Sequence, residues 1–445
     1  MTDLRIIDRL LSPLRQPREP IAKQSAIPIS KHLDDVEQCI KGIVSGSSDV
    51  ACRRLEVGSK RVSVLLFFLK GMTDEVSIQD YILRPLLHYR EAPVQAEILQ
   101  KTVLEVRETS STDDLNGAIA QMLRGKVVLF IEGSTQAIVM DARQYFGRVT
   151  EEPEAETTVT GPRDGFVENV ERNLALIRKR LPTPELKSRQ MHLGLNTHTD
   201  VAVCYMADRI TPELLSEVMQ RLEQLQQLDF PDVMDTSIIA EAIEDHPGSP
   251  FPQTMETERP DRTVANLLEG RVCILMDGTP KALIIPAALP DMFQSPEDYY
   301  QRPLAAAIAR WLRYVAAFLT TTSSAIYVAV LTFHYEVIPQ RLVVSVARNR
   351  ALVPFTSIFE ALVLEAAAEL LREATNRLPS TVGQVIGVVG ALVLGQSAVQ
   401  ANLISPLLVI VVAISTISSF AIPNNPGAIA LRLMRFPMIL AAGYL

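Results

Sequence analysis

The sequence predicts an α/β N-terminal soluble region of two related lobes, followed by an α-helical multi-pass membrane domain. Three observations predict it. Charged residues divide unevenly near residue 300, a segment of the first 300 residues is repeated, and long uncharged stretches occur only beyond residue 300. We expect a lead at 1–30, a first lobe at 31–155, a linker and helix at 156–188, a second lobe at 189–300 and a transmembrane domain at 301–445.

The charge distribution implies two different solvents. Of the 43 basic and 51 acidic residues, ten Arg and five Glu lie at 301–445, which contains neither Lys nor Asp. Residues 1–300 are therefore acidic, and their basic residues form no dense run. Because a phosphate backbone requires clustered Lys and Arg, we exclude nucleic-acid binding.

The first lobe begins after a flexible lead that lacks the continuous apolar core of a signal peptide, so we expect a cytosolic location. Helical spacing covers 32–44. An apolar strand is predicted at 61–70, and a helix at 72–87 with Thr73 as its N-cap.

An internal repeat is the most informative feature of the soluble region. Residues 123–140 align without a gap to 268–285, at an offset of 145 residues. Each copy predicts two apolar strands joined by an acid–glycine turn, Glu132-Gly133 and Asp277-Gly278, where glycine supplies the positive φ of a tight hairpin. We therefore expect two hairpins.

A weaker similarity between the segments that begin at Val62 and Val201 extends the repeat to a strand and a following helix. Each lobe is thus expected to combine a strand, a helix and a hairpin in a mixed sheet. Between the lobes, 167–181 has helical spacing, with Arg178, Lys179 and Arg180 suited to the negative end of its dipole. Residues 246–263 are predicted to be a proline-rich surface loop.

Four full membrane spans are predicted at 314–333, 353–371, 382–399 and 407–422, and 428–445 begins another. About 20 apolar residues cross a hydrocarbon core of about 30 Å. Arginines at 302–313, 372–377 and 432–435 fall on one side, which places the lobes in the cytoplasm. The arginines of 341–350 disagree, and this segment is predicted to be an amphipathic helix in the membrane interface.

Three glutamates lie in an otherwise apolar stretch of the predicted membrane domain: Glu360, Glu365 and Glu369. Each costs roughly 2.5–3.5 kcal/mol if ionised near mid-bilayer, so it must face protein or water. A cation path is the functional interpretation. The alternatives are an interfacial helix, or pairing with Arg372 and neighbouring arginines.

A glycine-rich segment follows, in which four glycines permit close helix packing: Gly383, Gly387, Gly390 and Gly395.

Catalytic and metal-binding patterns are missing from the sequence. The six histidines show no HExxH spacing, and no phosphate loop, nucleophile elbow or dinucleotide motif occurs. The four scattered cysteines, Cys39, Cys52, Cys204 and Cys273, are expected to be buried small hydrophobes in a reducing compartment. We expect no enzyme activity, no metal and no cofactor.

Four long stretches resemble the A-subunit of bacterial spore germination receptors, the GerA family. They are 161–181, which begins GPRDGF, 258–280, which begins ERPDRT, 295–314, which begins SPEDYY, and 418–437, which begins SSFAIP. The likeness extends in order from about Gly46 to Leu445. Members usually continue into a polar tail, so the end at Leu445 also leads us to expect a truncated chain.

The resemblance implies a multi-pass protein of the spore inner membrane, active in germination after sporulation, which assembles with B- and C-type receptor subunits and forms a homo-oligomer. It implies a germinant receptor subunit that forms or gates a cation-release ion channel. The alternative is a membrane-anchored scaffold for partner proteins. A secondary transporter ranks last, because the repeat lies in the soluble part and not in the helices.

Overall fold

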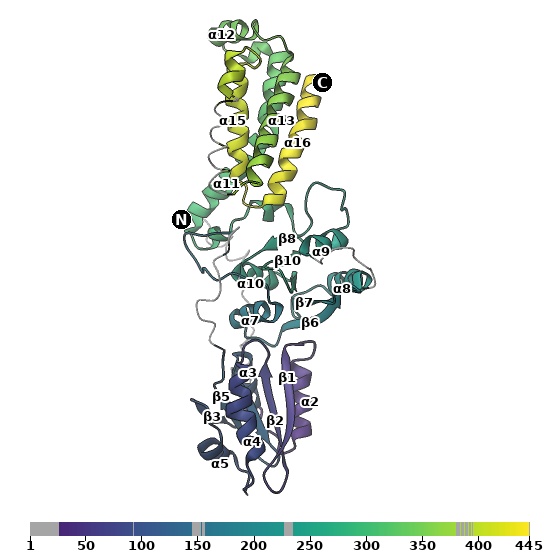
Figure 1. The fold of residues 1–445 in the computed structure, drawn as a ribbon, viewed down its shortest axis with the longest axis vertical. Helices are drawn as coiled ribbons and strands as arrows, with labels where there is room; N and C mark the ends of the chain where they lie inside the picture. Colours follow the sequence, from purple (N-terminus) through teal and green to yellow (C-terminus); the bar gives the residue numbers. More distant parts are fainter. Residues whose placement is uncertain are drawn as a thin grey trace, which may run out of the picture. The chain divides into compact units, whose positions relative to one another are not determined.

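The computed structural model describes residues 26–444 except 92, 145–152, 154–155, 227–234, 380–382, 384–386, 388–389, 391–392 and 394. The described chain divides into two compact units. One comprises 1–158, 162–244 and 254–286, and the other 159–161, 245–253 and 287–445. The first contains both predicted lobes, and the second, here called the helical unit, contains the predicted membrane helices (Figure 1). Most of the predicted lead, 1–25, lies outside the described residues.

The first lobe is a five-stranded sheet with helices on both faces. Its helical elements are α2 (Leu33–Ile43), α3 (Glu75–Ser77) continuing through a π-helical segment (Ile78–Leu83) into α4 (Arg84–His88), α5 (Ala96–Ile98) continuing into a second π-helical segment (Leu99–Val103), and α6 (Leu115–Leu123). Its strands are β1 (Val50–Val57), β2 (Val62–Leu69), β3 (Thr109–Thr112), β4 (Val127–Ile131) and β5 (Ala137–Met140).

The second lobe repeats this architecture. Its helices are α7 (Val170–Arg180), α8 (Pro212–Gln226), α9 (Thr236–Ile243) and α10 (Pro260–Leu268). Its strands are β6 (Leu186–Leu193), β7 (Thr199–Met206), β8 (Met255–Thr257), β9 (Val272–Met276) and β10 (Ala282–Ile285).

The two sheets have the same strand order, β1-β2-β4-β5-β3 and β6-β7-β9-β10-β8. The hairpin registers also agree, because Val127 opposite Met140 and Val272 opposite Ile285 differ by the offset of the sequence repeat. The predicted duplication and both hairpins are thus confirmed. The weaker alignment of Val62 with Val201 is shifted by two residues from the structural one. The strand registers place Val64, and not Val62, in the position that corresponds to Val201.

The expected mixed sheet is wrong, because every neighbouring pair of strands in both sheets is antiparallel. The connection through α6 does make β3 and β4 parallel to each other. The hairpin strand β5 lies between them, however, and pairs antiparallel with both. The same insertion of β10 separates β8 from β9 in the second lobe.

Alternating side chains of each strand supply two separate cores, as a pleated strand requires. In the first lobe Val64 and Leu66 face α4, whereas Leu65 and Phe67 face α2 and α6. In the second lobe one core contains α8 and α9 and the other α7 and α10. Both lobes are therefore three-layer sandwiches.

The acid of each predicted turn has a second role that sequence analysis missed. Glu132 accepts a hydrogen bond from the Leu33 backbone N–H at the start of α2 (3.1 Å), and Asp277 accepts one from Val170 at the start of α7 (3.0 Å). A carboxylate at a helix N-terminus satisfies an otherwise free N–H and favours the helix dipole. The repeat thus preserves a helix cap together with a turn.

Two further local predictions need correction. Thr73 is not the N-cap: its hydroxyl donates to the Leu69 carbonyl, and the Asp74 carboxylate accepts from Ser77 N–H instead. Segment 246–263 is not wholly a surface loop, because it contains the edge strand β8 and the start of α10. The prolines of this segment favoured a loop, and a strand of three residues is too short to produce a recognisable pattern.

The helical unit contains α11 (Pro303–Thr332), α12 (Gln340–Arg350), α13 (Ser357–Asn376), α15 (Pro406–Phe420) and α16 (Asn425–Tyr444), preceded by 3-10 turns at Leu289–Phe293 and Pro296–Tyr299 and with a third, Tyr335–Val337, between α11 and α12. Among the helices in the described part of the chain, α11 alone has the length and apolar composition of a membrane span, and α15 is apolar but has 15 residues. The four predicted spans are therefore not all confirmed. Half of the predicted span 382–399 lies outside the described residues.

Candidate functional site

Glu365 of α13 is fully buried at the centre of the helical unit. It forms an ion pair with Arg435 of α16 and accepts hydrogen bonds from Ser324 of α11 (2.5 Å) and Ser415 of α15 (3.3 Å). Arg435 also donates from Nε to the Thr320 carbonyl of α11 (3.0 Å). One ion pair thus ties four helices together.

The second glutamate of the stripe, Glu369, lies 3.3 Å from Arg432 of α16. Residues 365 and 369 of α13 and 432 and 435 of α16 are spaced by one helical turn, so both pairs lie between the same two helices. Glu365 and Glu369 therefore fit the alternative that the glutamates pair with arginines. Their partners are arginines of α16 and not Arg372.

Glu360 has a different environment. Only 1% of its surface is exposed, and neither carboxylate oxygen has a hydrogen-bond partner among the described residues. It lies in the first turn of α13, where the helix dipole favours a negative charge. The charged group near enough to interact with it is Arg350 of α12. The three predicted glutamates thus separate into two paired acids and one unpaired acid.

The predicted glycines lie against α13 and α15. A methyl group added at Gly383 or Gly390 would come within 2.8 Å of Thr375 O or Leu371 Cδ1, whereas Gly387 and Gly395 have ordinary contact distances to Thr375 and Val409. Close approach to α13 therefore requires glycine at Gly383, where the nearest atom is a backbone oxygen, whereas at Gly390 the nearest atom is the end of a flexible leucine side chain. Their proposed role in helix packing stays a prediction.

A buried ion pair that sequence analysis missed joins the two lobes. Arg178 of α7 donates from Nε and Nη2 to the two carboxylate oxygens of Asp49 (both 3.0 Å), and Ser188 of β6 donates to Asp49 as well (2.9 Å). The Nη1 group of Arg178 donates to the Leu186 and Thr183 carbonyls. Asp49 precedes β1 of the first lobe, so this interlobe pair fixes one lobe on the other.

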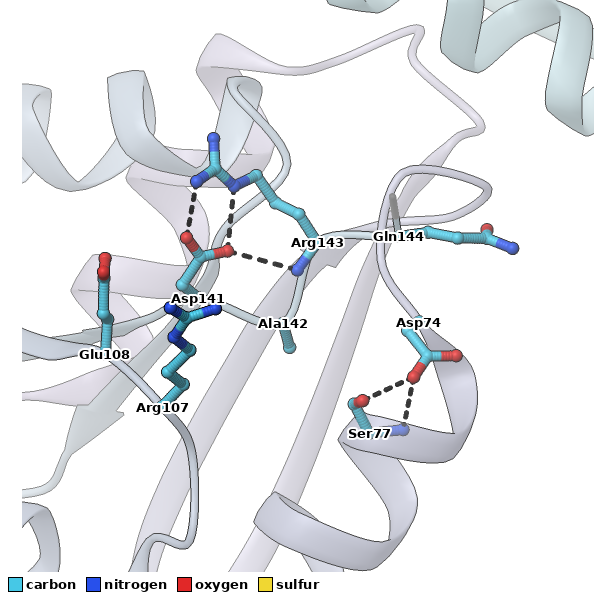
Figure 2. A pocket seen from close by; sticks show the side chains of 8 residues that line it. All are labelled: Asp74, Ser77, Arg107, Glu108, Asp141, Ala142, Arg143 and Gln144. Atoms are coloured by element: carbon cyan, nitrogen blue, oxygen red, sulfur yellow. Dashed lines mark hydrogen bonds and ion pairs between the residues drawn. The ribbon is translucent and has the colours of Figure 1, made fainter. Parts of the chain in front are cut away.

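A polar cavity of about 540 Å³ opens on the first lobe, with Asp74, Arg107, Asp141 and Arg143 in its wall. Figure 2 shows Arg143 folded over Asp141, whose carboxylate it hydrogen-bonds. The hydrogen bonds from Arg143 (Nε to Oδ1, 2.8 Å) lower the pKa of Asp141 below its usual value. Because its carboxylate is paired with Arg143 and its pKa is lowered, Asp141 is a weak general base.

The cysteines divide into two kinds. Cys204 and Cys273 oppose each other on β7 and β9 and are buried, whereas Cys39 and Cys52 are exposed, so the expectation that all four are buried is wrong for two of them. Burial raises the pKa of Cys204 to about 12 and that of Cys273 well above its usual value. Both buried thiols are therefore poor nucleophiles. Within the described residues no group of three His, Cys, Asp or Glu side chains could hold a metal ion.

Two α/β lobes related by duplication and a helical unit that buries ion pairs define a two-part protein. Residues 38–445 match the family model described as "Bacillus/Clostridium GerA spore germination protein". The chain belongs to this family of spore germination proteins, as the resemblance in the sequence indicated.

Relatives of known name cover most of the chain. Spore germination protein KA of Bacillus subtilis (strain 168) is 38% identical over 405 residues, which is 90% of this chain and 73% of that protein. Spore germination protein A1 of the same organism is 37% identical over 378 residues, 85% of this chain and 77% of that protein. "Uncharacterized membrane protein YfkQ", also from B. subtilis, is 36% identical over 416 residues, 93% of this chain and 80% of that protein.

A solved structure is also similar. The crystal structure of the N-terminal domain of the A subunit of the Bacillus megaterium spore germinant receptor GerK3 is 25% identical, and the match covers 60% of this chain and 99% of that chain, with a TM-score of 0.44.

Proposed function

We propose that this chain is a membrane subunit of a nutrient germinant receptor, and that it triggers spore germination by forming or gating a cation-release channel. Membership of the GerA family supports the role in germination. The observation that carries the channel proposal is Glu360, a buried carboxylate without a hydrogen-bond partner among the described residues. The proposed activity is not enzymatic and requires no cofactor.

A charge that is buried in the helical unit costs free energy. An ionised carboxylate removed from water costs several kcal/mol unless a cation or several donors compensate. Glu365 has such compensation from Arg435, Ser324 and Ser415, so a passing cation would compete with a fixed guanidinium. Among the described residues Glu360 has no hydrogen-bond donor, and the charge that acts on it is Arg350. A passing cation would supply the missing counter-charge there.

The three predicted path residues therefore receive different roles. We assign Glu360 to the cation path, and Glu365 and Glu369 to the framework that holds α13 against α16. The framework glutamates would affect conduction only through the position of α13.

The test is cation flux through liposomes that contain the purified full chain. Glu360→Gln should reduce flux or shift its cation selectivity, because the amide keeps the shape and removes the charge. The matched control is Glu373→Gln on the same helix, whose carboxylate is exposed and paired with Arg377 (2.7 Å). Flux identical in wild type and Glu360→Gln would remove this residue from the path, and no flux in the wild type would contradict a channel formed by this chain alone.

The proposed location is the inner membrane of the spore, with a multi-pass helical unit and the lobes in the cytoplasm. The apolar helix α11, the arginines near one end of the predicted spans and the membrane designation of the relative YfkQ support it. Helix α12 bears Arg341, Arg348 and Arg350 and fits the amphipathic interfacial helix that the sequence predicted. The proposed partners are B- and C-type receptor subunits and further copies of this chain.

The interlobe pair favours the scaffold as a second candidate function. Asp49 and Arg178 are fully buried and fully hydrogen-bonded, so the lobes present one rigid surface to a partner. A soluble fragment of residues 1–300 should then capture the same partners as the full chain. Capture by the full chain only, together with flux that depends on Glu360, would favour the channel.

A further inference from the structure

A cavity of about 600 Å³ in the helical unit is lined by α13, α15 and three glycines of the segment between them, Gly383, Gly387 and Gly395. Its described wall is largely apolar and includes Leu364, Ala367, Leu371, Val412 and Phe420, with Arg372 as its single charged side chain. The volume lies within the range of about 300–1,000 Å³ that is usual for ligand sites. The cavity is thus an apolar site with one cationic side chain in its described wall.

Arg372 is incompletely satisfied within the described residues. Its Nη2 donates to Ser419 (3.2 Å), and its guanidinium lies 4.8 Å from the centre of the Phe420 ring. Its Nη1 is buried and has no acceptor there. A buried guanidinium N–H without an acceptor is costly, and charged acceptors such as phosphate bind it most strongly.

The surrounding charges do not balance. Arg372 interacts electrostatically with two arginines and two glutamates: Arg432, Arg435, Glu365 and Glu369. Both glutamates are already paired with arginines of α16, which leaves Arg372 without a counter-ion among the described residues. Arg435 likewise has a buried Nη2 without an acceptor. The cluster of three arginines and two glutamates therefore needs one more negative charge.

We propose that this cavity binds one anionic phospholipid, with its phosphate against Arg372 and an acyl chain along the apolar wall. The inference rests on the membrane location proposed above. The positive charge of Arg372 excludes a cation as the ligand. The apolar wall favours a phospholipid over free phosphate, because free phosphate would leave the cavity unfilled.

The position of Arg372 agrees with a headgroup site. It lies four residues before the last residue of α13, about 6 Å along the helix axis. In the predicted topology this end belongs to the arginine-rich side, and basic pockets between membrane helices on the cytoplasmic side bind anionic headgroups. An acyl chain entering there could extend from the membrane surface toward Val412.

The test uses the purified full chain in a neutral detergent, titrated with dioleoyl phosphatidylglycerol or dioleoyl phosphatidylcholine at equal mole fraction. Native mass spectrometry should show one retained phosphatidylglycerol per chain, and the Tm should rise by at least about 2 °C with this lipid only. Arg372→Gln should abolish both effects. Ala367→Leu, which keeps the arginine and fills the cavity, should weaken retention at least tenfold.

The matched control is Arg377→Gln, whose side chain is 79% exposed at the end of the same helix and pairs with Glu373. This variant should retain the lipid like the wild type. Equal retention of phosphatidylcholine, an equal Tm shift with inorganic phosphate, or retention unchanged in Arg372→Gln would overturn the proposal. So would a cross-link between two copies through a cysteine placed at Ala413. Lipid binding that fails while flux still depends on Glu360 would leave the channel proposal standing.

Discussion

The helical unit and the interlobe junction both bury ionised side chains, but the two regions satisfy the hydrogen bonds of these side chains differently. Between the lobes, one arginine and one aspartate face each other, and serine and backbone groups take up the rest of their hydrogen bonds. In the helical unit, three arginines accompany two paired glutamates, and Glu360 stays unpaired among the described residues. In the first arrangement every charged atom has a partner, whereas the second contains buried charged atoms without a partner among the described residues.

This difference indicates which buried charges serve the fold alone and which are candidates for function. Native proteins leave few buried polar groups unpaired, so each exception requires an explanation. At the interlobe pair nothing remains to be explained, and its role is to hold β1 and β6 in one body. Among the described residues of the helical unit, Glu360 and Arg372 are two charged side chains of opposite sign that have buried atoms without a hydrogen-bond partner and that form no ion pair. We assign the first to a passing cation and the second to a bound anion.

The largest expected effect is the loss of the interlobe pair. Arg178→Ala leaves Asp49 buried without its cation, which should lower the local free energy of opening by about 3–5 kcal/mol. Hydrogen exchange of the β1 and β6 amides would report it as exchange faster by about two to four orders of magnitude. The control Arg180→Ala, which breaks a partly exposed pair with Asp164, should cost no more than about 1 kcal/mol. Equal effects of the two substitutions would show that burial of the interlobe pair has no energetic consequence.

A smaller effect is expected when the central pair of the helical unit is neutralised. Glu365→Gln keeps an acceptor for Ser324 but leaves Arg435 without its counter-ion, at a cost of about 1.5–3 kcal/mol. Thermal unfolding in a neutral detergent measures it, with Glu373→Gln as the exposed control. The double variant Glu365→Gln/Arg435→Gln should recover part of the loss. A double variant less stable than either single variant would contradict the assignment of Glu365 to the framework.

Local patterns in the sequence were sufficient for some of these features. The hairpin repeat could be predicted because glycine at a turn and alternating apolar residues act over a few positions, as at Gly133 and Gly278. Sheet order could not, since the insertion of β5 between β3 and β4 depends on distant pairing. The acidic residues of α13 could be located, but their partners on α16 lie about 60–70 residues away along the chain.

Arg178 shows where a signal existed and was misinterpreted. The arginines that end α7 were all assigned to the helix dipole, yet Arg178 is 1% exposed. It follows Val170 and Leu174 at helical spacing, so it belongs to the buried face of α7. A charged residue on the apolar stripe of a helix indicates a buried partner. The sequence does not indicate which residue that partner is, because Asp49 lies 129 residues away along the chain.

The smallest expected effect concerns Asp141, because its pair with Arg143 is buried only on one side. Arg143 lowers the pKa of Asp141, so the pair stabilises the fold above the usual pKa of aspartate, and this contribution is lost as the pH falls through the lowered pKa. Asp141→Asn should therefore destabilise the first lobe by no more than about 1 kcal/mol at pH 7, and its difference from wild type should shrink as the pH falls through the lowered pKa of Asp141.

Salt separates this pair from the interlobe pair. The Arg143 side chain is 41% exposed, so ions at about 1 M should reduce the effect of Asp141→Asn, whereas Arg178 and Asp49 are too buried to be screened. Urea unfolding of the first lobe at low and high salt measures both. A salt-independent effect of Asp141→Asn would place this pair with the buried, fully satisfied class, and the polar cavity beside it would then be part of the rigid framework.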